Sequence, residues 1–207
     1  MSQSYWEDSA EHKITLKVRN AEKTMNTCLY NSPIGVLKIC EADGKITNLS
    51  LYQKINNAAY SPEAQQCQCE LQDKQERQGK SCHEGHSNES CSELLRKACR
   101  QLDEYFQGKR KQFDLPLGHA GTPFQESVWR ELQDIPYGET RSYEDIAVKI
   151  GNPKAVRAVG QANNKNPILL MIPCHRVIHK NGDISGFACG IETKKYLLEL
   201  ERWGGCL

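Results

Sequence analysis

Residues 56–92 hold few large apolar side chains and are dominated by Gln, Glu, Ser, Lys and Asn. Such a segment buries too little apolar surface to offset the entropy that it loses on folding, so we expect a long mobile insertion here. The first 25 residues are also polar and lack a clear period, which predicts a loosely held tail. The chain therefore has to build its core from the sequence on either side of the insertion.

Before the insertion, short apolar segments alternate with turn signals. The signals are Ser-Pro-Ile-Gly at residues 32–35 and Asp-Gly at residues 43–44, and they separate apolar segments within residues 28–51. This pattern predicts a small antiparallel β-meander. After the insertion, Ser90-x-x-Glu93 resembles a capping box, and apolar residues at helical spacing follow until Gly108. We expect this amphipathic helix to pack on the meander.

The second half of the chain is predicted to be mostly helical. Helical spacing of apolar residues begins at Thr122-Pro123, and we place a domain boundary in the connector at residues 118–121. Ser142-x-x-Asp145 caps a short helix, and a Gly-Asn-Pro turn at 151–153 leads into a helix from Lys154 to about residue 163. Two short helices joined by a tight turn with glycine predict a helix-turn-helix.

The expected fold class is α+β with two domains. Residues 26–118 form an N-terminal domain of β-meander and helix, with the mobile insertion at about 56–92. Residues 119–207 form a mostly helical C-terminal domain that contains the helix-turn-helix.

The second helix of that motif combines small residues with long cations. A helix-turn-helix is also an ordinary corner between helices, and its alanines can simply pack in a core. A narrow charged ridge would equally fit a DNA minor groove, where the base-edge pattern is degenerate and contact is largely independent of sequence. The net charge of +1 decides nothing, but residues 149–180 hold six basic residues and no Asp or Glu. The candidate DNA-binding residues in the helix are Lys154, Ala155, Arg157, Ala158 and Gly160.

The most informative stretch is an apolar run that ends in Pro173-Cys174-His175-Arg176. Thiolate is the nucleophilic form of cysteine, and neighbouring cations or a positioned base lower a cysteine pKa into the reactive range. The alternative is a buried structural cysteine. Adjacent residues on an extended chain point to opposite faces, so a direct hydrogen bond from Cys174 to His175 requires a turn or a bridging water, and we favour the water. Glu201, in the final helical stretch, is the candidate acid that orients His175, although a solvated helix carboxylate is the simpler interpretation.

These motifs resemble one protein family. Ile172-Pro-Cys-His-Arg-Val177, with Gly151-Asn-Pro-Lys-Ala-Val-Arg-Ala-Val-Gly160 and Asn166-Pro167, is similar to the O6-alkylguanine-DNA alkyltransferases, the methylated-DNA-protein-cysteine methyltransferases. The similarity is dense over residues 122–203 and weaker, though collinear, over 28–51 and 94–117. It implies an enzyme that flips O6-alkylguanine out of duplex DNA and takes the alkyl group irreversibly, once per molecule. A monomer suffices for this, because one flipped base needs one pocket.

The resemblance also implies roles for individual residues. Cys174 corresponds to the alkyl acceptor, His175 to its water-mediated base, and Glu201 to the residue that orients that base. Asn166 corresponds to the residue that braces the cysteine segment.

Further residues correspond to the family's DNA and substrate contacts. Tyr143 would drive rotation of the nucleotide, and Arg157 would replace the extruded base in the stack. The carbonyls of Cys174 and Val177 would accept hydrogen bonds from the guanine amine. Phe187 stands where the family usually has a tyrosine, which puts proton donation to the guanine oxygen in question. Cys189 replaces a common glycine, so we expect a narrower pocket that disfavours bulky alkyl groups.

Ten cysteines spread along a chain without a signal segment indicate reduced thiols in an intracellular protein, nuclear in a eukaryote or cytoplasmic in a prokaryote. The sequence contains no run of about 18 apolar residues, the length that a membrane-spanning helix needs, so we expect no membrane span. We expect no cofactor, although a zinc site stays open as a minor alternative. The insertion carries residues of zinc-ligand type at spacings that fit no standard knuckle, and the family's zinc ligands are not matched by Cys28, Cys40 and His119. The insertion residues are Cys67, Cys69, Cys82, His83, His86 and Cys91.

Two other classes of protein compete with the alkyltransferase. One is a non-catalytic lesion sensor or a regulator that uses the helix-turn-helix alone, and the reactive cysteine motif argues against it. The other is a Cys-His hydrolase, but such enzymes generally place the cysteine and the histidine far apart in sequence.

Overall fold

The computed structural model describes residues 25–54, 92–184 and 186–204. Nearly all of the expected tail and of the expected insertion lies outside these residues, although Met25, placed in the tail, begins the first strand. The zinc-ligand types of the insertion also lie outside them, namely Cys67, Cys69, Cys82, His83, His86 and Cys91.

Three strands form the predicted antiparallel meander, in the order β1 (Met25–Ser32), β2 (Gly35–Ala42) and β3 (Lys45–Gln53). Asp43 and Gly44 both have positive φ, at 53° and 69°, as a two-residue hairpin turn of type I′ requires. Gly35 has φ of 125°, and a Cβ there would collide with the carbonyl oxygen of Gln53. The turn residues therefore fix the register of the sheet.

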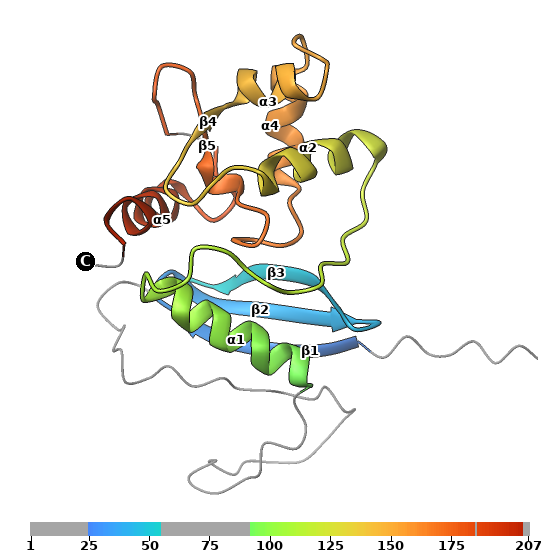
Figure 1. Ribbon diagram of the computed structural model, residues 1–207, viewed down its shortest axis with the longest axis vertical. Coiled ribbons are helices and arrows are strands. Elements are labelled where there is room, and N and C mark those ends of the chain that lie inside the picture. The colour runs from blue at the N-terminus through green and yellow to red at the C-terminus, as the bar shows by residue number, and fades with distance from the viewer. Residues whose placement is uncertain (1–24, 55–91, 185, 205–207) are drawn as a thin grey trace, which may run out of the picture.

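The predicted helix is α1 (Glu93–Phe106), which lies along one side of the sheet (Figure 1). The ring of Tyr30 on β1 stacks on Phe106 at 6.4 Å between ring centres, so the apolar faces of helix and sheet share one core. The helix begins two residues after the predicted cap. Ser92, rather than Ser90, accepts the hydrogen bond from the backbone N–H of Leu95.

The remaining helices are α2 (Pro123–Gln133), α3 (Tyr143–Lys149), α4 (Val156–Asn164) and α5 (Ile191–Trp203). Both predicted helix starts are confirmed: Ser142 begins α3 with the predicted cap, and Thr122 begins α2 with a capping box that was not predicted. Two short parallel strands, β4 (Arg141–Ser142) and β5 (Val177–Ile178), were not predicted, because two residues carry no period. The α+β fold class is confirmed, and the domain division near residue 118 stays a prediction.

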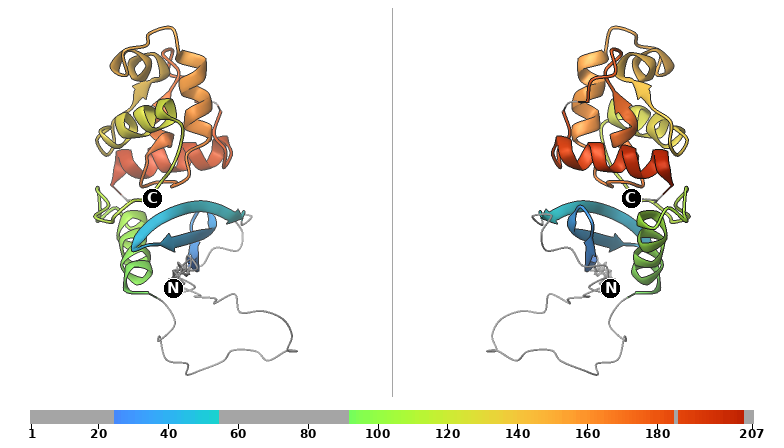
Figure 2. Two further views of the ribbon diagram at one scale, coloured as in Figure 1. Left: turned by 90° about the vertical axis from the view of Figure 1, so that its right-hand side faces the viewer. Right: turned by 90° about the vertical axis from the view of Figure 1, so that its left-hand side faces the viewer.

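The outer edge of β3 carries the segment that leads to Cys174. The backbone N–H of Leu49 donates to the carbonyl of Pro167 at 2.9 Å, and the N–H of Leu169 donates to the carbonyl of Leu49 at 2.8 Å. The C-terminal helices lie beyond this edge (Figures 1 and 2). The N-terminal sheet therefore supports the cysteine segment directly. Within the described part of the chain, no helix has both the length and the hydropathy to span a membrane.

Candidate active site

The backbone turns sharply at Cys174. Pro173 has φ −80° and ψ 65°, and the N–H of Cys174 donates to the carbonyl of Ile172 at 2.8 Å, which is an inverse γ-turn. A short 3-10 helix, η3 (Cys174–Arg176), follows at once. The chain is therefore not extended here. Even so, no hydrogen bond joins the thiol of Cys174 to the ring of His175 among the described residues.

Two asparagine side chains hold the turn. Nδ2 of Asn166 donates to the carbonyl of Ile172 at 2.7 Å, while its Oδ1 accepts from the N–H of Ile168 at 3.0 Å. Nδ2 of Asn163 donates to the carbonyl of Cys174 at 3.1 Å. Sequence reasoning named Asn166 but missed Asn163, whose only signal was a polar residue on the buried side of a helix.

The carboxylate of Glu201 is the centre of the hydrogen bonds behind the cysteine. Its Oε1 accepts from Nε2 of His175 at 2.8 Å, from Nη2 of Arg176 at 2.9 Å and from the hydroxyl of Tyr105 at 2.7 Å. Its Oε2 accepts from Nε of Arg176 at 2.8 Å and from the N–H of Gly138 at 3.1 Å. Glu201 is 4 % exposed, so it is not a solvated helix carboxylate.

Hydrogen bonds from His175 and Arg176 keep this carboxylate ionised. Burial alone would raise the pKa of Glu201, but these hydrogen bonds and the charge of Arg176 outweigh burial and bring the pKa below its usual range. An ionised carboxylate can only accept hydrogen bonds, so Nε2 of His175 carries a proton.

His175 is fully buried, and burial lowers its pKa despite the nearby carboxylate. The imidazole is therefore neutral near pH 7, and Nδ1 carries the free lone pair. Nδ1 is buried and has no hydrogen-bond partner within the described residues. The ring is thus positioned as a base whose accepting nitrogen receives no hydrogen bond from the described part of the chain.

Burial raises the pKa of the Cys174 thiol to about 11, although the hydrogen bond with Asn166 acts in the opposite direction. The charge of Lys194 also acts to lower this pKa, but it does not outweigh burial, so the predicted shift of the resting thiol into the reactive range is not found. Arg176 turns away from the sulfur, because its guanidinium binds Glu201 and the carbonyl of Ile135. The thiol therefore needs a base to become a nucleophile.

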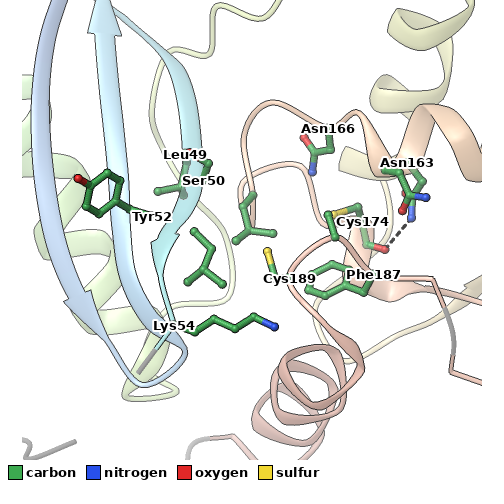
Figure 3. Close-up of a pocket in the computed structure, with 13 residues that line it drawn as sticks. Leu49, Ser50, Tyr52, Lys54, Asn163, Asn166, Cys174, Phe187 and Cys189 are labelled. Atoms are coloured by element: carbon green, nitrogen blue, oxygen red, sulfur yellow. Dashed lines mark hydrogen bonds between the residues drawn. The ribbon is translucent and has the colours of Figure 1, made fainter. Parts of the chain in front are cut away.

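Cys174 lines a cavity of about 350 Å³ between β3 and the C-terminal helices (Figure 3). Phe187 and Cys189 form one wall, and β3 forms the other with residues that sequence reasoning did not predict. Lys54, directly after the end of β3, reaches across toward the loop at Cys189, and its charge works against the burial that raises the pKa of Cys189. The β3 residues of this wall are Leu49, Ser50, Leu51 and Tyr52.

Lys194 is a further residue near the site that the sequence did not reveal. It is fully buried, and its ammonium donates to the carbonyl of Val177 at 2.6 Å. The ammonium also lies 5.8 Å from the ring centre of Tyr143 and 5.9 Å from that of Phe187. Burial lowers the pKa of Lys194, while Cys174 raises it. Lys194 therefore joins three of the predicted pocket residues.

Two family models match nearly all of the described chain. Residues 123–203 match the DNA binding domain of 6-O-methylguanine DNA methyltransferase, and residues 25–118 match its ribonuclease-like domain. The chain belongs to the 6-O-methylguanine DNA methyltransferase family.

Similar members of this family occur in bacteria and archaea. The constitutive methylated-DNA–protein-cysteine methyltransferase of Bacillus subtilis is 44 % identical over 172 residues, which is 83 % of this chain and 92 % of that protein. A methyltransferase of the same description from Methanosarcina acetivorans is 57 % identical over 114 residues, covering 55 % of this chain and 72 % of the relative. These organisms have no nucleus, so they give no support to a nuclear location.

A solved structure of a family member shares the fold. The OGT of Mycobacterium tuberculosis in complex with DNA superposes with a TM-score of 0.64 and 37 % identity, over 85 % of this chain and 92 % of that one. The R37L variant of the Mycobacterium tuberculosis protein gives a TM-score of 0.66 at 37 % identity, over 87 % of this chain and 94 % of that one.

The helix predicted to start at Lys154 begins two residues later, so Arg157, Ala158 and Gly160 lie on α4, while Lys154 and Ala155 lie in the turn before it. Lys154, Arg157 and Ala158 are exposed, and Ala155 and Gly160 are half-buried. Tyr143, at the start of α3, is 8 % exposed and lies behind Gly160. The cationic side chains therefore face outward. Of the four predicted pocket residues, Phe187 and Cys189 line the cavity at Cys174, whereas Tyr143 and Val177 are not among its lining residues.

The residues compared with the family's zinc ligands do not come together. Sγ of Cys28 lies 3.7 Å from Sγ of Cys99, and His119 pairs with Glu126 at 2.9 Å. Across the described ranges, no three His, Cys, Asp or Glu side chains gather in a way that could hold a metal ion.

Proposed function

We propose that the protein repairs DNA by direct reversal, moving an alkyl group from O6 of guanine to Sγ of Cys174 in a single turnover. The observation that carries this proposal is the neutral His175, which is held by Glu201, keeps a free buried lone pair and stands next to a buried thiol that opens into a cavity.

The reaction begins with proton removal. A water between the thiol and Nδ1 of His175 passes the proton of Cys174 to that nitrogen, and Glu201 stabilises the imidazolium that forms. The thiolate then attacks the alkyl carbon. A carbon–sulfur bond forms, the carbon–oxygen bond breaks, and its electron pair stays with the guanine. A thioether has no easy route back to a thiol, so each molecule acts once.

The substrate base has to leave the DNA stack. Cys174 is only 4 % exposed, so an O6-alkyl group within the duplex cannot reach its sulfur. We assign α3 and α4 to a helix-turn-helix that lies in the minor groove, with Lys154 near phosphates. Arg157 fills the gap left by the flipped nucleotide, and Tyr143 turns that nucleotide toward the pocket. All these residues come from one chain, which favours a monomer.

The inner wall of the pocket sets the size of the alkyl group. Phe187 has no hydroxyl to offer the guanine oxygen, so it contributes shape alone. Cys189 is 8 % exposed and occupies space in the cavity beside Phe187. We therefore assign small alkyl groups, methyl above all, as the preferred substrates.

Incubation with a duplex that carries one O6-methylguanine tests this function by intact mass and peptide mapping. We expect one methyl gain on the Cys174 peptide, limited to one per protein and absent from Cys174→Ala. Tight binding of the duplex without any mass gain would overturn the proposal in favour of a non-catalytic lesion sensor.

A further inference from the structure

We propose that Tyr105, on the N-terminal helix α1, is a positioning residue for alkyl transfer, because its hydroxyl holds the Glu201 carboxylate and thereby sets how strongly His175 attracts a proton. This inference rests on the function proposed above. It gives the N-terminal half of the chain, which carries no motif for that chemistry, a part in it that acts through Glu201 and His175.

Three donors share a single oxygen atom of Glu201. The hydroxyl of Tyr105 makes the shortest of these contacts with Oε1, at 2.7 Å, compared with 2.8 Å for His175 and 2.9 Å for Arg176. Each donor withdraws negative charge from the oxygen that it binds. The strength with which Oε1 supports the imidazolium of His175 therefore depends on how much charge Tyr105 takes.

The Tyr105 hydroxyl is a permanent donor. The residue is 0 % exposed, and its pKa lies well above the ordinary value, chiefly because of burial and then because of the Glu201 charge. It therefore stays protonated over the whole range in which the protein works. The other donors to Glu201 among the described residues, on Gly138, His175 and Arg176, all lie in the C-terminal half.

Packing alone does not require this hydroxyl. The Tyr105 ring contacts the rings of Phe106, Phe113 and Tyr137, with centres 5.4, 5.4 and 6.1 Å away. A phenylalanine at position 105 would fill the same space among these rings. A buried hydroxyl needs a partner, and here the partner is the carboxylate that orients the base.

Removal of the hydroxyl has two expected effects. The Glu201 carboxylate loses one of its fixed contacts, so it holds the His175 ring less firmly and transfer slows. The carboxylate also retains more charge on Oε1, which raises the pKa of His175 and moves the acid limb of the rate profile to higher pH. A role in packing alone would not move the acid limb.

The test compares Tyr105→Phe with Tyr137→Phe, measured as single-turnover methyl transfer from duplex O6-methylguanine over a range of pH. The Tyr137 hydroxyl belongs to the same aromatic cluster but donates to the backbone carbonyl of Leu200, at 3.3 Å. We expect Tyr105→Phe to be roughly tenfold slower at the plateau, with its midpoint about half a pH unit higher. We expect Tyr137→Phe to match the wild type. Equal rates and midpoints in the two variants would overturn the inference.

A second variant covers the case in which Tyr105→Phe does not fold. 3-Fluorotyrosine at position 105 is nearly isosteric with tyrosine and is a stronger hydrogen-bond donor. It should shift the midpoint in the opposite direction, to lower pH, and an unchanged midpoint would also overturn the inference. A wild-type protein that takes up no methyl group would instead refute the proposed function itself.

Discussion

Nε2 of His175 lies 2.8 Å from Oε1 of Glu201, and both side chains are almost completely shielded from water. This contact fixes the tautomer of the imidazole and leaves Nδ1 as the accepting nitrogen. It also commits a negative charge to the interior, where Arg176 compensates it through two hydrogen bonds. The same pair therefore carries part of the stability of the fold as well as the basicity of the site.

Glu201→Gln should damage both properties. The change leaves the buried guanidinium of Arg176 without its counter-charge, and we expect a loss of about 3 kcal/mol in the free energy of unfolding. Denaturant unfolding measures this loss, and single-turnover transfer should slow in parallel. Glu192→Gln on the same helix is the control, because its ion pair with Lys195 is exposed and of little energetic value. Equal losses of unfolding free energy in the two variants would contradict a stabilising role of the buried ion pair between Glu201 and Arg176.

The free energy of unfolding should decrease in two steps as the pH is lowered. Burial places the folded pKa of His175 below the ordinary value of 6.5, so the unfolded chain binds a proton that the folded chain refuses. This contribution is complete above pH 6.5 and is lost as the pH falls below it. The folded pKa of Glu201 also lies below its ordinary value of 4.5. Its contribution to the free energy of unfolding is therefore complete above pH 4.5 and is lost as the pH falls further.

Urea unfolding at a series of pH values tests the first step. The free energy of unfolding of His175→Gln should depend less steeply on pH below about 6.5 than that of the wild type. An equally steep dependence in the variant would assign the loss of stability to other histidines. The transfer rate of the wild type should also drop over this range, because a protonated imidazole cannot accept the thiol proton.

Cys189→Gly should widen the pocket. We expect transfer from O6-benzylguanine to rise by roughly tenfold relative to transfer from O6-methylguanine, since a small change of side-chain volume in an apolar pocket has about this effect on selectivity. Competition between the two substrates measures the ratio. Cys189→Ser keeps the volume and removes the thiol, so a similar rise in that variant would exclude the steric explanation.

Lys154→Gln should weaken DNA binding by a similar factor for every sequence. Removal of one phosphate contact lowers the slope of log affinity against log salt by about one. Fluorescence anisotropy at several salt concentrations gives that slope. Lys97→Gln serves as the control, because this lysine lies on α1, away from α3 and α4, and pairs with Asp114. An unchanged slope in Lys154→Gln would remove the residue from the DNA face.

Local signals predicted the frame of the molecule well. Thr122 and Ser142 each cap a helix together with a partner three positions further along the chain. So short a spacing can be recognised in the sequence alone. The meander follows equally from its turns. The start of α1 was misplaced by two residues because two serines near the start of that helix can serve as its cap.

The polar interior could not be predicted in this way. Asn163, Lys194 and Tyr105 bind partners that lie 11, 17 and 96 positions away in the sequence. A polar residue on a helix is expected to face water unless the partner that satisfies it in the core is known. The pKa of Cys174 was misjudged for a related reason, since the direction of its shift depends on burial and on where Arg176 points.

Helix α5 contacts the cysteine segment at both of its ends. Lys194 binds the carbonyl of Val177, and Glu201 binds His175, seven positions further along the helix. Seven residues make nearly two full turns, so both side chains leave the helix on the same side. Removal of one residue between them would rotate Glu201 by about 100° relative to Lys194. The spacing between these two positions therefore cannot tolerate insertions or deletions, even though the exposed side chains of Lys195 and Glu199 between them can be exchanged.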